Sequence, residues 1–190
     1  MSTIKPLVGA LERRFAHHLW FFRLYAAPYR RLVKRELRLA GVKRNETLLS
    51  IGCGALPFSA VLAHSFTGAR VIAVDVDRAA AERARLLVER MGLSGSIRIV
   101  IADASTGRLP PADVALVALQ AAPKDEIWRN LQRSLRPGTG RAVFRLPRPG
   151  LESEYGSFTG LRAVVGRVHH AMPTFDRSVL CVAANREAVA

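Results

Sequence analysis

The chain has 190 residues, of which 49% are hydrophobic; this suits one domain with a proper core and excludes a disordered chain. No run of 18 apolar residues occurs, so we expect no conventional transmembrane helix. The formal charge of +14 is uneven, because residues 1–44 hold 11 basic and 2 acidic residues and so carry +9, which suggests an anionic partner. Cys53 and Cys181 make neither a disulfide framework nor a metal site, and no signal peptide is evident, so we expect a cytoplasmic protein.

Residues 7–40 predict two helical pieces separated near Pro28. Apolar residues recur at three- and four-residue steps in the first piece, and the aromatic run Trp20–Tyr25 widens that stripe. The second piece carries five basic residues around its apolar face: Arg30, Arg31, Lys34, Arg35 and Arg38. In one interpretation residues 1–41 form a helical lid that closes over a ligand. In the other, residues 8–40 contact an anionic membrane surface, so that the protein is peripheral at the membrane. We expect no nucleic-acid partner, since that would need aromatic and basic residues interleaved on one face.

The stretch Asn45–Asp75 organises the rest of the chain. A short apolar run, Thr47–Ile51, predicts a buried strand and is followed at once by Gly52 and Gly54. Glycines allow a sharp turn and let a ligand lie against the backbone. Pro57 then begins a helical segment, Phe58–Ser65, and a second apolar run, Val71–Val74, ends on Asp75. Strand, glycine turn, helix, strand and acid form the mononucleotide-binding half of a doubly wound sheet. Pro57 stands where a dinucleotide fingerprint has its third glycine, which argues against pyrophosphate binding.

The remaining chain alternates helices and strands until its end. We expect helices over Arg78–Met91, with Asp77 as N-cap, and Lys124–Leu135, and strands over Ile97–Ile101, Asp113–Leu119 and Arg141–Leu146. Two further strands, Leu161–His169 and Ser178–Ala184, follow each other without a helix, and therefore require an antiparallel pair. The fold class is thus α/β: a Rossmann-like, mostly parallel seven-stranded sheet with one antiparallel strand near the C-terminal edge, plus N-terminal helices.

These residues resemble a known superfamily. The run Leu48–Gly54 looks like the first motif of class I S-adenosylmethionine-dependent methyltransferases, and Asp75 looks like their ribose-binding acid. Two positions depart from that pattern, since Ser50 replaces an acid and Leu56 replaces a third glycine. The Gly-Cys-Gly-Ala-Leu-Pro sequence of the turn is closer to nicotianamine synthases, which use the same fold and cofactor. The resemblance implies that residues 42–190 form an S-adenosylmethionine-binding domain.

The resemblance also implies a set of site residues. The cofactor S-adenosyl-L-methionine would contact the glycine turn with its methionine portion, the acid after the second strand with its ribose, and the segment after the third strand with its adenine. The residues so implied are Ile51, Gly52, Cys53, Gly54, Ala55, Asp75, Val76, Asp103, Ala104 and Gln120. Asp103 has the alternative role of a turn residue. We expect no metal ion.

Candidate catalytic residues lie near the carboxyl edge of the sheet. Tyr155, His169 and His170 are possible bases, and Arg145 stands at the end of the fifth strand, where nicotianamine synthases carry an arginine. His169 and His170 could instead be an ordinary strand end, and Arg145 a charge that seeks a carboxylate.

Three functions remain open on the sequence. The first is a methyltransferase for a small molecule or lipid, and the second is a transferase or cyclase that uses the 3-amino-3-carboxypropyl group of the cofactor. The third is a non-enzymatic cofactor-binding partner protein. The segment Gln120–Pro123 lacks the Asn-Pro-Pro-Tyr signature, so methylation of base amines or protein amides is not supported.

Overall fold

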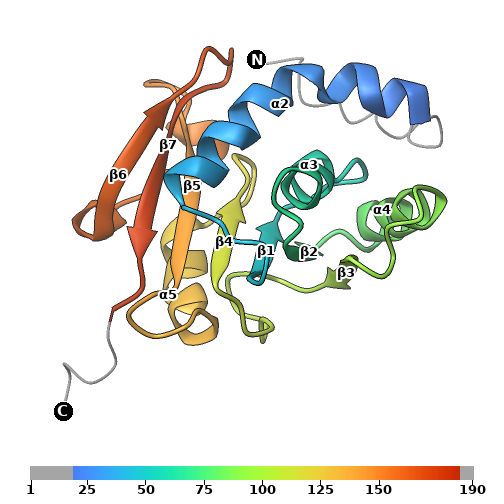
Figure 1. The fold of residues 1–190 in the computed structure, drawn as a ribbon. Helices are drawn as coiled ribbons and strands as arrows, with labels where there is room; N and C mark the ends of the chain where they lie inside the picture. Colours follow the sequence, from blue (N-terminus) through green and yellow to red (C-terminus); the bar gives the residue numbers. More distant parts are fainter. Residues whose placement is uncertain (1–18, 185–190) are drawn as a thin grey trace.

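The computed structural model describes residues 19–184, with side chains from Tyr29 onward except that of Leu161. A seven-stranded sheet in the order β3-β2-β1-β4-β5-β7-β6 forms its centre (Figure 1). Its strands are β1 Thr47–Ile51, β2 Arg70–Asp75, β3 Ile97–Ile101, β4 Val114–Val117, β5 Arg141–Pro147, β6 Val164–His169 and β7 Phe175–Val182. The first five are parallel, and β7 pairs antiparallel with both β5 and β6. The predicted fold class, with its one reversed strand, is confirmed.

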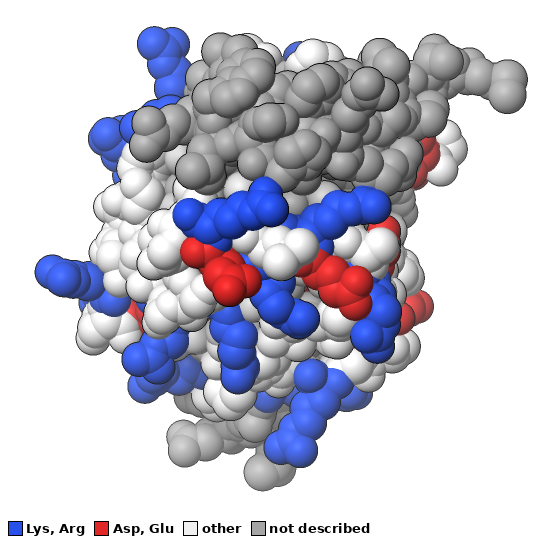
Figure 2. Space-filling view, turned by 90° about the vertical axis from the view of Figure 1, so that its right-hand side faces the viewer, with Lys and Arg blue, Asp and Glu red and all other residues white. Residues whose placement is uncertain are grey.

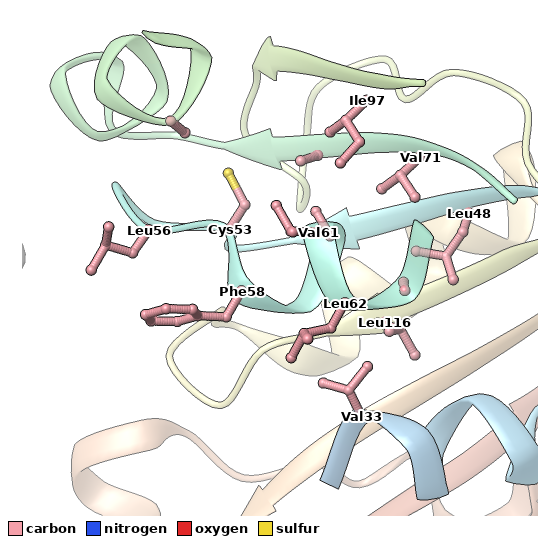
Figure 3. Close-up of a cluster of buried hydrophobic side chains, with 14 of the residues drawn as sticks. Val33, Leu48, Cys53, Leu56, Phe58, Val61, Leu62, Val71, Ile97 and Leu116 are labelled. Carbon is pink, nitrogen blue, oxygen red and sulfur yellow. The ribbon is translucent and has the colours of Figure 1, made fainter. Parts of the chain in front are cut away.

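Helices cover both faces of this sheet. Three of them, α2 (Leu19–Leu39), α3 (Phe58–Thr67) and α4 (Arg78–Arg90), lie on one face, and α5 (Lys124–Ser134) lies on the other (Figure 1). Side chains of successive strand residues point to opposite faces, so each strand serves two cores. In β1, Leu48 joins the cluster under α2, α3 and α4, while Leu49 joins the cluster under α5. Figure 3 shows the first cluster, in which Val33 of α2 points toward Leu62 of α3.

The N-terminal helix corrects one expectation. The predicted break near Pro28 is absent, because α2 runs as one helix from Leu19 to Leu39. A proline removes one backbone hydrogen bond and crowds the preceding turn, but its own φ is compatible with a helix, so the turns on either side can continue. Residues 1–18, and the side chains of Trp20–Tyr25, lie outside what the structure describes, so the predicted aromatic stripe is not tested.

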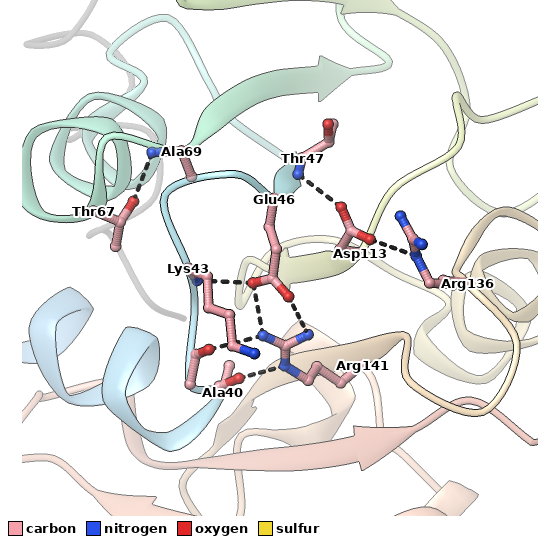
Figure 4. Close-up of polar contacts among 10 residues, drawn as sticks. Ala40, Lys43, Glu46, Thr47, Thr67, Ala69, Asp113, Arg136 and Arg141 are labelled. Carbon is pink, nitrogen blue, oxygen red and sulfur yellow. Dashed lines mark hydrogen bonds and ion pairs between the residues drawn. The ribbon is translucent and has the colours of Figure 1, made fainter.

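A polar network ties the end of α2 to the sheet (Figure 4). The guanidinium of Arg141, at the start of β5, donates to both carboxylate oxygens of Glu46 (3.0 and 2.8 Å) and to the carbonyls of Ala40 and Gly41. Gly41 has a φ of +58° and its N–H donates to the Arg38 carbonyl, so the predicted helix C-cap is confirmed. The entry into β1 is therefore fixed at the edge opposite the glycine turn.

The C-terminal part differs from the prediction in its boundaries. β6 begins at Val164, after a short 3-10 helix over Gly160–Ala163, and β7 begins at Phe175, three residues earlier than expected. A short helix not predicted from the sequence, α6 (Glu152–Tyr155), follows β5. None of the helices in the described part of the chain is long and apolar enough to span a membrane.

Basic and acidic side chains lie together on one face of the molecule (Figure 2). Figure 2 shows the face at the α4 side, where Lys and Arg are interspersed with Asp and Glu. One such contact is the exposed pair of Arg78 and Glu82, with 3.8 Å between its nitrogen and oxygen. Exposed pairs of this kind contribute about 0–1 kcal/mol to stability. On the described part of this face the charges form a mixed surface.

Candidate active site

The chain turns sharply after β1 at two glycines with positive φ. Gly52 has a φ of +72° and Gly54 a φ of +65°, values that L side chains rarely adopt. A Cβ on Gly52 would lie 3.3 Å from the Cβ atoms of both Ala118 and Ala121, so this glycine also allows close packing on the segment after β4. A Cβ on Gly54 would meet no described atom within 4 Å. The second glycine therefore faces open space.

Asp75 connects this turn to the next strand. Its Oδ2 accepts the N–H of Gly54 (2.7 Å), and its Oδ1 accepts the N–H of Asp77 (3.0 Å). Asp77 in turn caps α4, since its side chain accepts the N–H groups of Ala79 and Ala80, as predicted. Each carboxylate oxygen of Asp75 keeps a second acceptor site. The carboxylate thus holds the turn in shape and can still accept hydroxyl groups.

A cavity of about 580 Å³ lies at the carboxyl ends of β1, β2 and β4, a volume typical of sites for small molecules. The strand order reverses between β1 and β4, which is where ligands bind in open α/β sheets. The predicted cofactor residues that line it are Ile51, Gly52, Cys53, Gly54, Asp75, Val76, Asp103, Ala104 and Gln120. Ala55 is buried and is not part of the lining. The cavity therefore lies where the motif predicted a ligand.

Two of these residues have altered acid strength. The side-chain and backbone hydrogen bonds from Ser105 lower the pKa of the exposed Asp103, whose Oδ1 accepts the Ser105 Oγ–H (2.6 Å) and N–H (2.8 Å). Asp103 thus also makes the turn contacts considered as its alternative role. Burial, and then the charge of Asp75, raise the pKa of the Cys53 thiol to about 12. Cys53 is therefore a neutral lining group and not a nucleophile at ordinary pH.

The predicted catalytic residues are only partly brought together. Tyr155 and Arg145 line the cavity, whereas His169 and His170 do not. His169 lies exposed on β6, which is separated from β5 by β7, and its carbonyl accepts a hydrogen bond from Arg35 (3.1 Å). Burial, and then Glu154, raise the pKa of Tyr155, so its phenol stays protonated and can act as a hydrogen-bond donor.

Sequence reasoning missed a buried ion pair at this site. Glu36 of α2 is 0% exposed and Arg145 is 6% exposed. The Nε and Nη2 groups of Arg145 donate to Glu36 Oε1 (2.9 Å) and Oε2 (2.8 Å), and Nη2 also donates to Ser59 Oγ (2.9 Å). The carboxylate predicted as an alternative partner for Arg145 is thus Glu36. A lone acid on the apolar face of a basic helix was the signal that could have pointed to it.

Sequence reasoning also missed a second buried cation, Lys124, at the start of α5. Its Nζ donates to the carbonyls of Leu119 (2.8 Å), Ala121 (3.2 Å) and Tyr155 (2.5 Å). These bonds attach the segment after β4 to α6, so that Gln120, Ala121 and Tyr155 face one cavity. The sequence gives no signal for this role, since lysine at a helix start is common on protein surfaces.

Comparison with known proteins agrees with this geometry. Residues 48–138 match the family described as "Methyltransferase domain". An L-histidine 2-aminobutanoyltransferase from Yersinia pestis is 30% identical over 133 residues, which cover 65% of this chain and 49% of the relative. A protein-L-isoaspartate O-methyltransferase from Aeropyrum pernix is 35% identical over 123 residues, 64% of this chain and 46% of the relative. The chain thus spans about half the length of these curated relatives.

Among solved structures, MtNAS in complex with MTA and tNA has a TM-score of 0.70 at 26% identity, covering 83% of this chain and 60% of that one. A point mutant of MtNAS in complex with S-adenosylmethionine has the same TM-score at 24% identity, covering 92% and 66%. An RNA methyltransferase from Salinibacter ruber shares the fold, with a TM-score of 0.64 at 20% identity. The superposition covers 80% of this chain and 90% of that one. S-Adenosylmethionine is the cofactor that this type of domain uses. The glycine turn, the acid after β2 and the sheet order of this chain, together with the match over residues 48–138, support the fold of class I, S-adenosylmethionine-dependent methyltransferases.

Proposed function

We propose that the protein binds S-adenosylmethionine in the cavity at the end of β1 and transfers a group from it to a small molecule. The observation that carries this proposal is the joint placement of Gly54 and Asp75: an open glycine turn bonded to a carboxylate that keeps two acceptor sites. Asp75 would hold the ribose hydroxyls, and the segment Ala102–Ala104, which also lines the cavity, would flank the adenine.

S-Adenosylmethionine supplies a sulfonium whose methyl group or 3-amino-3-carboxypropyl arm passes to a nucleophile, while the pair of the broken C–S bond stays on sulfur. The protein's own part is to bind, align and exclude water. Tyr29 from α2 and Ser59 from α3 lie near Arg145 in the cavity lining, and Tyr155 from α6 also lines the cavity. Because α2 supplies part of this lining, its position supports the proposed lid over residues 1–41.

We favour transfer of the 3-amino-3-carboxypropyl arm over methyl transfer. Support comes from a relative that is 30% identical and is named a 2-aminobutanoyltransferase. It comes also from MtNAS, which is 26% identical and was solved in complex with MTA, the nucleoside that arm transfer would release. Methyl transfer is the second candidate, because a relative at 35% identity is named a methyltransferase. The nucleoside product distinguishes them: methylthioadenosine from arm transfer, or S-adenosylhomocysteine from methyl transfer. A protein that binds the cofactor but forms neither product with candidate amino acids, amines and lipids would be the non-enzymatic binding protein.

Binding itself is tested by calorimetry with the Asp75→Ala variant. The ribose contact would consist of two hydrogen bonds to a charged acceptor, each contributing about 1.5–3 kcal/mol, so affinity should fall at least tenfold. The matched control is Asp77→Ala, which removes the helix cap at the same junction and should cost about 1 kcal/mol of stability, with little effect on affinity. Unchanged affinity in Asp75→Ala would refute the proposed ribose site.

A further inference from the structure

The cavity has charges of opposite sign at its two ends. Asp75 ends β2 and Asp103 follows β3, whereas Arg145 lies near the end of β5. Three strand spacings separate β2 from β5 in the sheet order, or about 14 Å at about 4.8 Å each. Of the described residues that line the cavity, Arg145 alone is cationic. The end away from the two acids is therefore the place for an anionic group.

Arg145 has donors left over after its protein contacts. A guanidinium carries five N–H groups. Nε uses one on Glu36, and Nη2 uses two, on Glu36 and Ser59. The two N–H groups of Nη1 find no partner among the residues that the structure describes. No buried side-chain nitrogen in that part of the chain is left without a hydrogen bond, which agrees with an Nη1 that keeps some exposure. Because Arg145 lines the cavity and is 94% buried, we infer that Nη1 reaches the cavity.

The surrounding residues hold this guanidinium still. Glu36 Oε1 also accepts the hydroxyl proton of Ser178 (2.7 Å). That hydroxyl has no second proton, so His170 Nε2, 3.0 Å away, must donate to Ser178 Oγ. The Arg145 Cζ lies 5.9 Å from the centre of the Phe175 ring. A guanidinium fixed in this way can donate from its remaining nitrogen, Nη1, to a carboxylate without first being ordered.

Arg145 also keeps its charge in this environment. Burial works to lower the pKa of Arg145, but the negative charge of Glu36 and its hydrogen bonds outweigh burial and raise it. A planar guanidinium can bind one carboxylate on its Nε–Nη2 edge and present Nη1 to another. Glu36 therefore occupies only the Nε–Nη2 edge of the Arg145 guanidinium and leaves Nη1 for another group.

We propose that Nη1 of Arg145 binds a ligand carboxylate, which makes the β5 end of the cavity a carboxylate subsite. The carboxylate can belong to the amino-acid arm of the cofactor or to an amino-acid acceptor. This inference deepens the proposed function by naming a ligand group that the site recognises. It rests on the proposed function only in assuming that this ligand binds in the same cavity as the cofactor.

The test uses ligands that differ only in the carboxylate. S-Adenosylmethionine, its decarboxylated form and methylthioadenosine are titrated by calorimetry into the full-length protein and into Arg145→Lys. A panel of amino acids and the corresponding amides is then titrated with methylthioadenosine present. Lysine keeps a positive charge beside Glu36 but lacks the fork, so carboxylate ligands should lose at least tenfold in affinity while methylthioadenosine is unchanged. Arg148→Lys is the matched control, because Arg148 lies at the same strand exit, donates to the Met172 carbonyl and does not line the cavity.

Two comparisons of affinity identify the ligand that supplies the carboxylate: S-adenosylmethionine against its decarboxylated form, and amino acids against their amides. If it is the cofactor's, the wild-type protein prefers S-adenosylmethionine to its decarboxylated form, and Arg145→Lys loses that preference. If it is the acceptor's, the two cofactor forms bind alike, and amino acids bind where amides do not. Equal binding in both comparisons overturns the subsite, and the wild-type comparisons decide this even if Arg145→Lys fails to fold. Amino-acid binding that depends on Arg145, in a protein that binds no nucleoside, would refute the proposed function and leave the subsite standing.

Discussion

The ion pair between Glu36 and Arg145 should be costly to break from either side. The two side chains are 0% and 6% exposed, and two charge-assisted hydrogen bonds join them. Arg145→Leu leaves the Glu36 carboxylate buried with Ser178 as its remaining hydrogen-bond donor, so it should destabilise the fold by about 3–5 kcal/mol. Glu36→Leu should cost less, since Nη1 of Arg145 reaches the cavity. With both replaced, neither charge of this pair is left buried without its partner, and the double variant should be more stable than Arg145→Leu alone.

The assay is urea unfolding at pH 7, followed by circular dichroism, for the four proteins of a double-mutant cycle. A matched cycle on Glu46 and Arg141 serves as control, because this pair is also joined by two hydrogen bonds, here from Nη1 and Nη2, and each side chain is 15% exposed. Its coupling energy should be smaller, since solvent screens that pair more strongly. Additive effects of the Glu36 and Arg145 replacements, or a single-variant cost below about 1 kcal/mol, would refute the argument from buried charge.

Four further outcomes are expected. Gly54→Val should fold with a strain cost of about 1–2 kcal/mol, since its Cβ meets no described atom, and should fail to bind the cofactor in calorimetry. The Cys53 thiol, with its pKa raised to about 12, should resist iodoacetamide at pH 8 until urea unfolds the protein; rapid labelling would contradict its burial. Burial raises the pKa of Glu46, but hydrogen bonds from Arg141 and the Lys43 N–H outweigh it and lower the pKa overall, so this contribution to stability is present above the unfolded pKa and lost as pH falls. Glu46→Gln should therefore lose less stability than wild type between pH 7 and pH 3 in urea titrations. If the basic N-terminal segment contacts membranes, the full chain should float with anionic vesicles at low salt and be released by about 1 M salt, where the Debye length is about 3 Å; failure to float at low salt would refute the membrane hypothesis.

The end of the cavity formed by the glycine turn and Asp75 was predictable because its signals are local. The glycine turn and Asp75 lie within one strand–helix–strand unit, and the spacing of such a unit fixes where its residues meet. Asp103 and Gln120 were implied by the family resemblance, and both line the same cavity because the carboxyl ends of neighbouring parallel strands share one edge of the sheet. The one reversed strand followed from the short connection between the last two strands.

The other end of the cavity could not be predicted, since it depends on contacts between distant residues. Glu36 and Arg145 are 109 positions apart, and each taken alone is an ordinary charged residue. The buried role of Lys124 depends on carbonyls from two separate segments. His169 was placed at the correct edge of the sheet, but nothing local showed that β7 would lie between it and the cavity.

Because α2, in its described part, lines only one end of the cavity, sequence changes can alter the two ends of the site independently of each other. The Asp75 end of the cavity is built from the segments that follow β1, β2, β3 and β4, whereas the other end takes Tyr29 directly from α2 and has its arginine bonded to Glu36. If the nucleoside binds at the Asp75 end, as proposed, substitutions in α2 can reshape the acceptor side while the nucleoside side stays intact. A chimaera that receives the first 40 residues of a relative, together with that relative's residue at the position of Arg145, should then exchange acceptor preference and keep cofactor binding.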